Sequence, residues 1–226
     1  MAATKLPQAD FVFESGLTAR GGVLAGMDEV GRGALAGPVC VGVTVVLDRS
    51  VPVPVGLTDS KLLTPRRRAA LAQELRAWVD AWAVGTATAR EIDAVGIIGA
   101  LRLAGERALE KVSATIDDVE LVLLDGSHDW LTGRARDSGE LDLFGSASGA
   151  RSPKVVTKVK ADVSCASVAA ASVLAKCHRD AIMAELDAHY PGYGWLRNKG
   201  YGSADHREAI GQLGPTGLHR RSWRLN

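Results

Sequence analysis

Four acidic residues stand where their side chains could hold metal ions. Asp28 and Glu29 are adjacent at the end of a short apolar segment, and Asp125 ends the most apolar segment of the chain. A fourth, Asp162, stands just before a long alanine-rich stretch. Neighbouring carboxylates repel each other unless a cation compensates their charge, and oxygen ligands suit a hard divalent ion. Two such ions could activate a water and stabilise the leaving oxygen of a phosphodiester.

Each of these acidic residues also has an ordinary interpretation. An isolated pair such as Asp28-Glu29 is more often a solvated turn, and Asp162 could serve only as the N-cap of the following helix. Asp125 favours a site, because open α/β sheets bind their ligands at the carboxyl ends of strands. The sequence has no histidine cluster spaced for zinc and no GxxxxGK[ST] motif, which argues against two common kinds of site.

Three further segments could contact a phosphate, a sugar or a base. The glycines of Gly31-Arg32-Gly33 would let backbone N–H groups come close to a phosphate or a sugar. Asp59-Ser60-Lys61 offers a cation and a hydroxyl, and Tyr201 lies between glycines, where its ring could stack on a sugar or base. Each segment also has an ordinary interpretation. Gly31-Arg32-Gly33 alone is more often a turn, Asp59-Ser60-Lys61 could be only the polar start of a helix, and the segment around Tyr201 could be a turn with a half-buried tyrosine.

The elements that would position these residues follow from hydrophobic patterning and turn residues. Helices are expected after Thr64 and over Glu91–Val112 and Val163–Tyr190. Strands that alternate with such helices predict an α/β sheet with helices on both faces. The expected strands are Leu24–Met27, Val39–Leu47, Ala83–Ala89, Val119–Leu124 and Lys154–Val159.

The first of these helices has a clear start. Thr64 is a suitable N-cap, and Pro65 fits the first helical position. Four apolar residues then recur at helical spacing and predict a buried face. They are Leu71, Leu75, Trp78 and Trp82.

The composition is that of a globular protein with an uneven charge distribution. The 226 residues carry a formal net charge of +1, are 46% hydrophobic and include three cysteines without CxxC spacing. Residues 1–150 hold 15 Lys/Arg against 20 Asp/Glu (−5), whereas residues 151–226 hold 12 against 6 (+6), so the C-terminal third could attract a polyanion. Few cysteines, no signal-like N-terminus and no apolar run of spanning length predict a cytoplasmic protein without membrane contact.

Together, these segments resemble the type 2 ribonuclease H (ribonuclease HII) family. The matching motifs occur in family order between residues 25 and 222, and the Asp-Glu-Val-Gly-Arg-Gly block is highly specific. The motifs are Ala25-Gly26-Met27-Asp28-Glu29-Val30-Gly31-Arg32-Gly33, Ala36-Gly37-Pro38-Val39, Thr58-Asp59-Ser60-Lys61, Leu124-Asp125-Gly126, Lys160-Ala161-Asp162, the run from Ser167 to Lys176, Lys199-Gly200-Tyr201 and His219-Arg220-Arg221-Ser222.

The resemblance implies an RNase H-like fold, which is a mixed central sheet with helices on both faces, plus a small helical C-terminal extension. It implies an endoribonuclease that hydrolyses the RNA strand of RNA–DNA hybrids and incises 5′ of single ribonucleotides embedded in duplex DNA. The products would carry 3′-hydroxyl and 5′-phosphate ends, and the role would be ribonucleotide removal from DNA. Two Mn²⁺ or Mg²⁺ ions would be held by Asp28, Glu29, Asp125 and, as the fourth catalytic acid, Asp162.

The resemblance also assigns residues to substrate recognition. Gly31-Arg32-Gly33 would read the 2′-hydroxyl group that distinguishes RNA from DNA. Tyr201 would stack on the adjoining deoxyribose, and Lys61 would contact a phosphate. The sequence departs from the family at Gly202, where proline is common, and in a connection after Asp125 that is longer than usual.

The expected organisation is a catalytic domain over residues 1–190, with a mobile insertion over residues 128–153, and a substrate-binding extension over residues 191–226. A monomer is expected. Two alternatives stay open: a two-metal nuclease specific for DNA structure, and a catalytically inactive nucleic-acid-binding module. The Gly-Arg-Gly loop and Tyr201 argue against the first, and the four intact acidic residues argue against the second.

Overall fold

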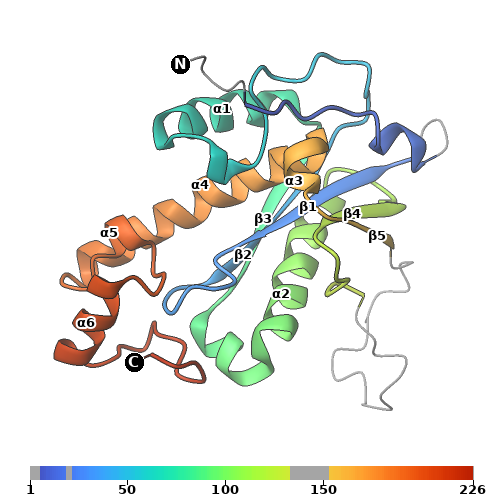
Figure 1. Cartoon of the computed structure of the whole chain (residues 1–226). Helices are drawn as coiled ribbons and strands as arrows, with labels where there is room; N and C mark the ends of the chain where they lie inside the picture. Colours follow the sequence, from blue (N-terminus) through green and yellow to red (C-terminus); the bar gives the residue numbers. More distant parts are fainter. Residues whose placement is uncertain (1–5, 19–21, 133–152, 226) are drawn as a thin grey trace, which may run out of the picture.

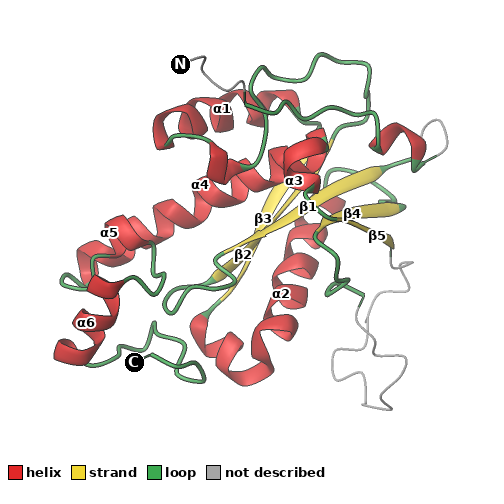
Figure 2. Cartoon of the chain, in the orientation of Figure 1, coloured by secondary structure: helices red, strands yellow, loops and turns green. Residues whose placement is uncertain are grey.

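A five-stranded mixed sheet forms the centre of the molecule, and helices cover both of its faces (Figure 1, Figure 2). The computed structural model describes residues 6–18, 22–132 and 153–225. Across these residues the strand order is β3-β2-β1-β4-β5; β1, β4 and β5 are parallel, and β2 is antiparallel to both of its neighbours. The expected mixed sheet with helices on both faces is therefore confirmed.

The expected strands and helices are present, with ends that differ by a few residues. The strands are β1 (Leu24–Val30), β2 (Val39–Val45), β3 (Ala81–Ala87), β4 (Leu121–Asp125) and β5 (Lys154–Lys158). The α-helices are α1 (Pro65–Trp78), α2 (Ala89–Ser113), α3 (Ala161–Ser164), α4 (Ala166–His189), α5 (Trp195–Asn198) and α6 (Ala204–Leu213). Short 3-10 helices are η1 (Glu14–Gly16) and η2 (Ser60–Leu62).

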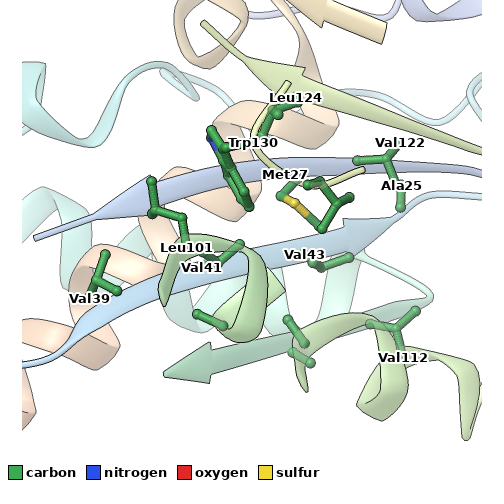
Figure 3. Close-up of a cluster of buried hydrophobic side chains, with 14 of the residues drawn as sticks. Ala25, Met27, Val39, Val41, Val43, Leu101, Val112, Val122, Leu124 and Trp130 are labelled. Atoms are coloured by element: carbon green, nitrogen blue, oxygen red, sulfur yellow. The ribbon is translucent and has the colours of Figure 1, made fainter. Parts of the chain in front are cut away.

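The alternating side chains of the central strands divide the core between two helical layers. Met27 points to the face covered by α2, where it belongs to one cluster with Leu101 and Trp130 (Figure 3). On the other face α4 packs against β1 and β2, and α1 packs on α4. Glycine permits this close approach, because a Cβ atom at Gly42 would lie 2.5 Å from the carbonyl oxygen of Ala171 in α4.

Capping residues determine where the first two long helices begin. The Thr64 side chain caps α1 and Pro65 occupies its first turn, as expected. Thr88 and Glu91 form a capping box at the start of α2. The preceding strand therefore ends at Ala87, two residues earlier than the sequence pattern indicated.

The buried face expected for α1 is only partly correct. Leu71 and Leu75 are fully buried and Trp78 is half-buried, whereas Trp82 lies in β3 and is 38% exposed. The backbone becomes extended directly after Trp78. The helical spacing of the apolar residues thus continues by coincidence across a helix–strand boundary.

The long helix expected from Val163 is divided into α3 and α4. The two helices meet at Cys165, whose backbone is extended (φ −109°, ψ 123°). An N-terminal arm, residues 6–17, runs beside this break, and the backbone of Asp10 forms hydrogen bonds to the residues on either side of Cys165. The arm thus supplies partners for backbone groups that the break removes from the helix.

The insertion expected over residues 128–153 lies mostly outside the described residues. Its described beginning belongs to the core, because Trp130 is 1% and Leu131 is 6% exposed and both pack with α2. The two side chains thereby anchor the chain shortly after β4.

The C-terminal extension packs against the second half of α4 and against the loop between β1 and β2. This loop, residues 31–38, is called the glycine loop below. The shared apolar cluster consists of Leu35, Ala36, Met183, Tyr193, Trp195, Ala209 and Ile210. None of the described helices is long and apolar enough to cross a membrane.

Candidate metal centre and nucleic-acid interface

The adjacent carboxylates Asp28 and Glu29 differ in their surroundings because successive strand residues point to opposite faces. Asp28 is 4% exposed and faces α4, where the Ser172 hydroxyl forms a hydrogen bond to it. The Glu29 side chain is more open, and its Oε1 atom lies 3.3 Å from Nη1 of Arg32. Neither carboxylate is a freely solvated turn residue, so the ordinary interpretation of this pair is wrong.

Asp125 and Asp162 lie beside the same end of the sheet. β4 runs parallel to β1 with Leu124 paired to Met27, so Asp125 follows beside Asp28. The backbone N–H of Asp162 donates to Oδ1 of Asp125 over 3.3 Å. Asp162 is the second residue of α3 and is 5% exposed; the N-cap positions of α3 and α4 belong to Lys160 and Cys165. The capping role considered for Asp162 is therefore wrong.

The charges of the four carboxylates act on one another. Burial, together with the negative charge of Glu29 and of the two more distant carboxylates, holds the pKa of Asp28 well above its usual range. Burial and the neighbouring Asp125 and Asp59 raise the pKa of Asp162 to about 6. The cost of these charges would fall if a cation bound among them.

Lys61 supplies a mobile positive charge at the edge of this group. Its Nζ atom lies 3.8 Å from Oδ2 of Asp162 and 3.9 Å from Oδ1 of Asp59, and its side chain is 67% exposed. Partial burial lowers the pKa of Lys61, but the surrounding carboxylates outweigh it and raise the pKa above the ordinary value. Such an exposed ammonium can turn outward to a phosphate at little cost.

The glycine loop begins with a residue that must be glycine. Gly31 has φ +84°, and a Cβ atom there would lie 2.0 Å from Nε of the buried Arg179. Among the described residues, the backbone N–H groups of Arg32 and Gly33 have no protein acceptor. These two donors are thus free for a ligand.

Tyr201 lies next to the glycine loop. It forms a backbone bridge with Ala34, and the carbonyl of Gly200 accepts the N–H groups of Leu35 and Ala36. The tyrosine is 37% exposed, and the Arg179 guanidinium lies 5.4 Å from the centre of its ring. The ring is therefore held but still open on one side.

A pocket of about 260 Å³ joins these parts. It is lined by Asp28, Glu29, Val30, Ser60, Lys61, Lys176 and Tyr201. The structure thus brings the paired carboxylates, the predicted phosphate contact and the predicted stacking residue to one cavity. Asp125, Asp162 and Gly31-Arg32-Gly33 lie beside this pocket but do not line it.

Sequence reasoning missed two residues of this site, both on α4. Lys176 lines the pocket, and its Nζ atom lies 2.5 Å from Oδ1 of Asp180. Ser172, one helical turn earlier, contacts Asp28 and its hydroxyl lies 3.0 Å from that of Ser60. The signal is the i, i+4, i+8 spacing of Ser172, Lys176 and Asp180, which places the three polar side chains on one face of α4.

The donor set suits a hard divalent cation, since all four candidate ligands are carboxylates. No group of three or more His, Cys, Asp or Glu side chains in the described part of the chain is already arranged to hold a metal ion. The fit instead rests on the mutual repulsion of Asp28, Glu29, Asp125 and Asp162, which a cation would relieve.

Comparisons with known proteins show the family of this chain. The family model for ribonuclease HII matches residues 25–226. The chain is 48% identical over 202 residues to ribonuclease HII of Streptomyces avermitilis, covering 89% of this chain and 76% of that protein. It is 42% identical over 203 residues to ribonuclease HII of Thermus thermophilus, covering 89% of this chain and 86% of that protein.

The fold also matches a solved structure. The crystal structure of ribonuclease H2 from Pyrococcus horikoshii superposes with a TM-score of 0.65 and 26% sequence identity, over 90% of this chain and 94% of that one. The expected RNase H-like fold is thereby confirmed. The family model covers nearly the whole chain and both relatives exceed 40% identity, so the protein belongs to the ribonuclease HII family of endonucleases.

Proposed function

We propose that this protein hydrolyses the RNA strand of RNA–DNA hybrids and incises duplex DNA 5′ of single embedded ribonucleotides. The cut would leave 3′-hydroxyl and 5′-phosphate ends, and the role would be ribonucleotide removal from DNA. Membership of the ribonuclease HII family supports action on RNA–DNA hybrids. A monomer is expected to suffice, because the acidic group, the glycine loop and Tyr201 all come from one chain.

One observation carries the proposal: the adjacent carboxylates Asp28 and Glu29 line a pocket that also contains Lys61, Lys176 and Tyr201, next to free backbone N–H groups. A phosphodiester in this pocket would meet both ammonium groups. The adjoining ribose would face the glycine loop, and the next sugar would face the aromatic ring. A nuclease that ignores the 2′-hydroxyl would have no use for such a loop.

The carboxylates Asp28, Glu29, Asp125 and Asp162 would hold two Mn²⁺ or Mg²⁺ ions. Bound there, the ions would lower the pKa of an attacking water and neutralise charge that develops on the phosphate. The protein's own groups do the rest. Lys61 and Lys176 orient the phosphate, and the N–H groups of Arg32 and Gly33 donate to the ribose 2′-oxygen.

Asp180 keeps Lys176 in place for this role. Burial lowers the pKa of this lysine, whereas the contact with Asp180 opposes that shift and favours the charged ammonium group. Asp180 is also bound at 3.2 Å by the largely buried Arg68, so the lysine has a fixed partner rather than a mobile one. A cation placed in this way acts on the phosphate without first being ordered.

The test is cleavage of a labelled DNA duplex with one internal ribonucleotide, with Mn²⁺ and separately with Mg²⁺. An all-DNA duplex, a long RNA–DNA hybrid and the Asp28→Asn variant are measured beside it. We expect a single cut 5′ of the ribonucleotide, which is absent from all-DNA and from the variant. Cleavage of all-DNA would indicate a structure-specific DNA nuclease, and metal binding without any cleavage would indicate a binding module.

A further inference from the structure

The segment His219-Arg220-Arg221-Ser222 has no part in the function proposed above. Together with its neighbours it forms a strap, residues 218–223, across the glycine loop. Arg220 N–H donates to the carbonyl of Leu35, and Gly37 N–H donates to that of Leu218. The strap is tied to α2, since the carboxylate of Asp93 accepts the N–H groups of both residues that follow Arg220.

Arg220 is an unusual residue for a protein interior. It is 0% exposed, and none of the described carboxylates forms a salt bridge with it. Its hydrogen bonds all go to backbone: it donates to the carbonyl of Gly31 at 2.6 Å, of Arg32 at 2.7 Å and of Gly37 at 3.3 Å. The guanidinium also lies 4.9 Å from the centre of the Trp223 ring. A buried charge is costly, so its retention under this loop calls for a reason.

The carbonyls that Arg220 bonds explain why a buried charge is kept at this position. A peptide group is planar, so fixing the carbonyl of Gly31 also fixes the direction of the Arg32 N–H, and fixing the carbonyl of Arg32 fixes the Gly33 N–H. A cation bonded to a carbonyl oxygen also polarises the peptide and makes its N–H a stronger donor. These are the two N–H groups that have no protein acceptor among the described residues.

We infer that Arg220 is a positioning residue for ribose recognition, because its buried guanidinium aims and polarises the N–H groups of Arg32 and Gly33 toward the 2′-oxygen. The inference rests on the proposed function and extends it. The neighbouring buried Arg179 bonds other carbonyls, those of Ala36, Pro38 and Lys199. Arg220 is thus the link between the strap and the ribose-facing peptides.

The experiment measures discrimination rather than activity alone. Single-turnover rates and half-saturation concentrations are determined on two DNA duplexes that differ at one position, a ribonucleotide or its 2′-fluoro analogue, which is a much weaker acceptor. For Arg220→Gln we expect the rate ratio of the two substrates to fall about tenfold, with a smaller fall for Arg220→Lys, which keeps the charge. Arg221→Gln is the control with the same change of charge, at the adjacent exposed position.

A merely structural role would lower both rates by one factor, because fewer molecules would be folded, and would leave the ratio unchanged; that result would overturn the inference. Should Arg220→Gln not fold, the test is made on Arg220→Lys, whose single ammonium group cannot bond all three carbonyls at once, and its ratio must still fall. Failure of the wild-type protein to prefer the ribonucleotide would contradict the proposed function itself. The two failures are therefore distinguishable.

Discussion

Asp28 combines deep burial with three acidic neighbours, and this combination has a consequence for stability. Without bound cations, its carboxylate loses hydration and is repelled by Glu29, Asp125 and Asp162. We expect Asp28→Asn to abolish cleavage and to raise the melting temperature of the metal-free protein by roughly 2–6 °C, or about 1–2 kcal/mol. Calorimetry in the presence of a chelator measures the second effect.

The exposed Asp117 provides the matched control for this substitution. Asp117→Asn removes the same charge away from the site and should leave the melting temperature nearly unchanged. Addition of Mn²⁺ should stabilise the wild-type protein more than Asp28→Asn, because only the wild type keeps all four carboxylates. A destabilised Asp28→Asn variant under chelation would mean that hydrogen bonding of this carboxylate outweighs the repulsion.

Tyr201 offers a ring whose contribution depends on the substrate. In the proposed function it stacks on the deoxyribose next to a ribonucleotide, a junction that a single-ribonucleotide duplex always presents and a long hybrid rarely does. We expect Tyr201→Ala to lower kcat/KM about tenfold more on the former than on the latter, in line with the energy of stacking on one nucleotide. Steady-state kinetics on both substrates gives the comparison.

Tyr201→Phe is the informative companion variant. In the described structure the tyrosine hydroxyl has no hydrogen-bond partner, whereas the ring is held by Arg179. Phenylalanine keeps the ring and should keep both activities. Equal losses on both substrates in Tyr201→Ala would assign the residue to general packing and not to the junction.

Much of the candidate site followed from the sequence because acidic residues at strand ends are a local signal. Asp28 and Asp125 were placed correctly from the apolar segments that they close. Lys176 was not, because its approach to the pocket depends on how α4 lies across the sheet. The role of Arg220 does not follow from its motif, since its partners lie near residue 31, far away in the sequence.

Among the elements, α4 depends on a partner that hydrophobic patterning does not reveal. Its first turn is met by the N-terminal arm, where Oε1 of Glu14 accepts the N–H of Ser167 at 3.0 Å. The other carboxylate oxygen of Glu14 is buried without a hydrogen bond. Burial outweighs these favourable contacts and raises the pKa of Glu14 to about 7.

This shift fixes the sign of a pH effect. The pKa of Glu14 is 4.5 in the unfolded chain and about 7 in the folded protein, so the folded protein binds the proton more tightly. The contribution of Glu14 to folding stability is therefore fully present below pH 4.5 and is lost as the pH rises to 7. Glutamine keeps the acceptor and cannot ionise. We expect Glu14→Gln to leave stability unchanged at pH 4 and to raise it by about 1–3 kcal/mol at pH 8, as measured by urea unfolding.

The exposed Glu74 in α1 serves as the control for this variant. Glu74→Gln removes the same charge in solvent and should show no such pH-dependent gain. A Glu14→Gln variant that is less stable than wild type at pH 8 would show that the ionised carboxylate caps α4, and the favourable helix dipole would then exceed the cost of burial.

The sequence pattern does not reveal the break at Cys165 for a related reason, because the arm that supports it lies over 150 residues earlier.

At the scale of the whole molecule, the C-terminal segment that packs on α4 and the glycine loop is itself held together by two buried histidines. His206 Nδ1 donates to the carbonyl of Tyr201 at 2.9 Å, and its Nε2 accepts from Trp195 at 2.9 Å. His219 Nδ1 accepts the N–H of Thr216, so its own Nε2 is the donor to His206. These bonds require both rings to be neutral.

Protonation should therefore weaken these contacts within the C-terminal segment in a defined pH window. Burial, with the neighbouring His206, lowers the pKa of His219 to about 4 from an ordinary value of 6.5. The unfolded chain thus binds a proton that the folded protein refuses, and stability is lost as the pH falls from 6.5 to 4. The loss from His219 is about 1–3 kcal/mol.

Because Glu14 titrates in an overlapping window with the opposite sign, the effect of His219 is best measured in the Glu14→Gln background. His219→Asn places an amide oxygen where Nδ1 accepts from Thr216, but it cannot bind a proton and loses the bond to His206. It should be less stable than its parent at pH 7 by about 1 kcal/mol and should lose less stability between pH 6.5 and 4. His189→Asn, at an exposed position, should keep the parent's slope. Parallel slopes for His219→Asn and its parent would mean that the pair accepts a proton without loosening the extension.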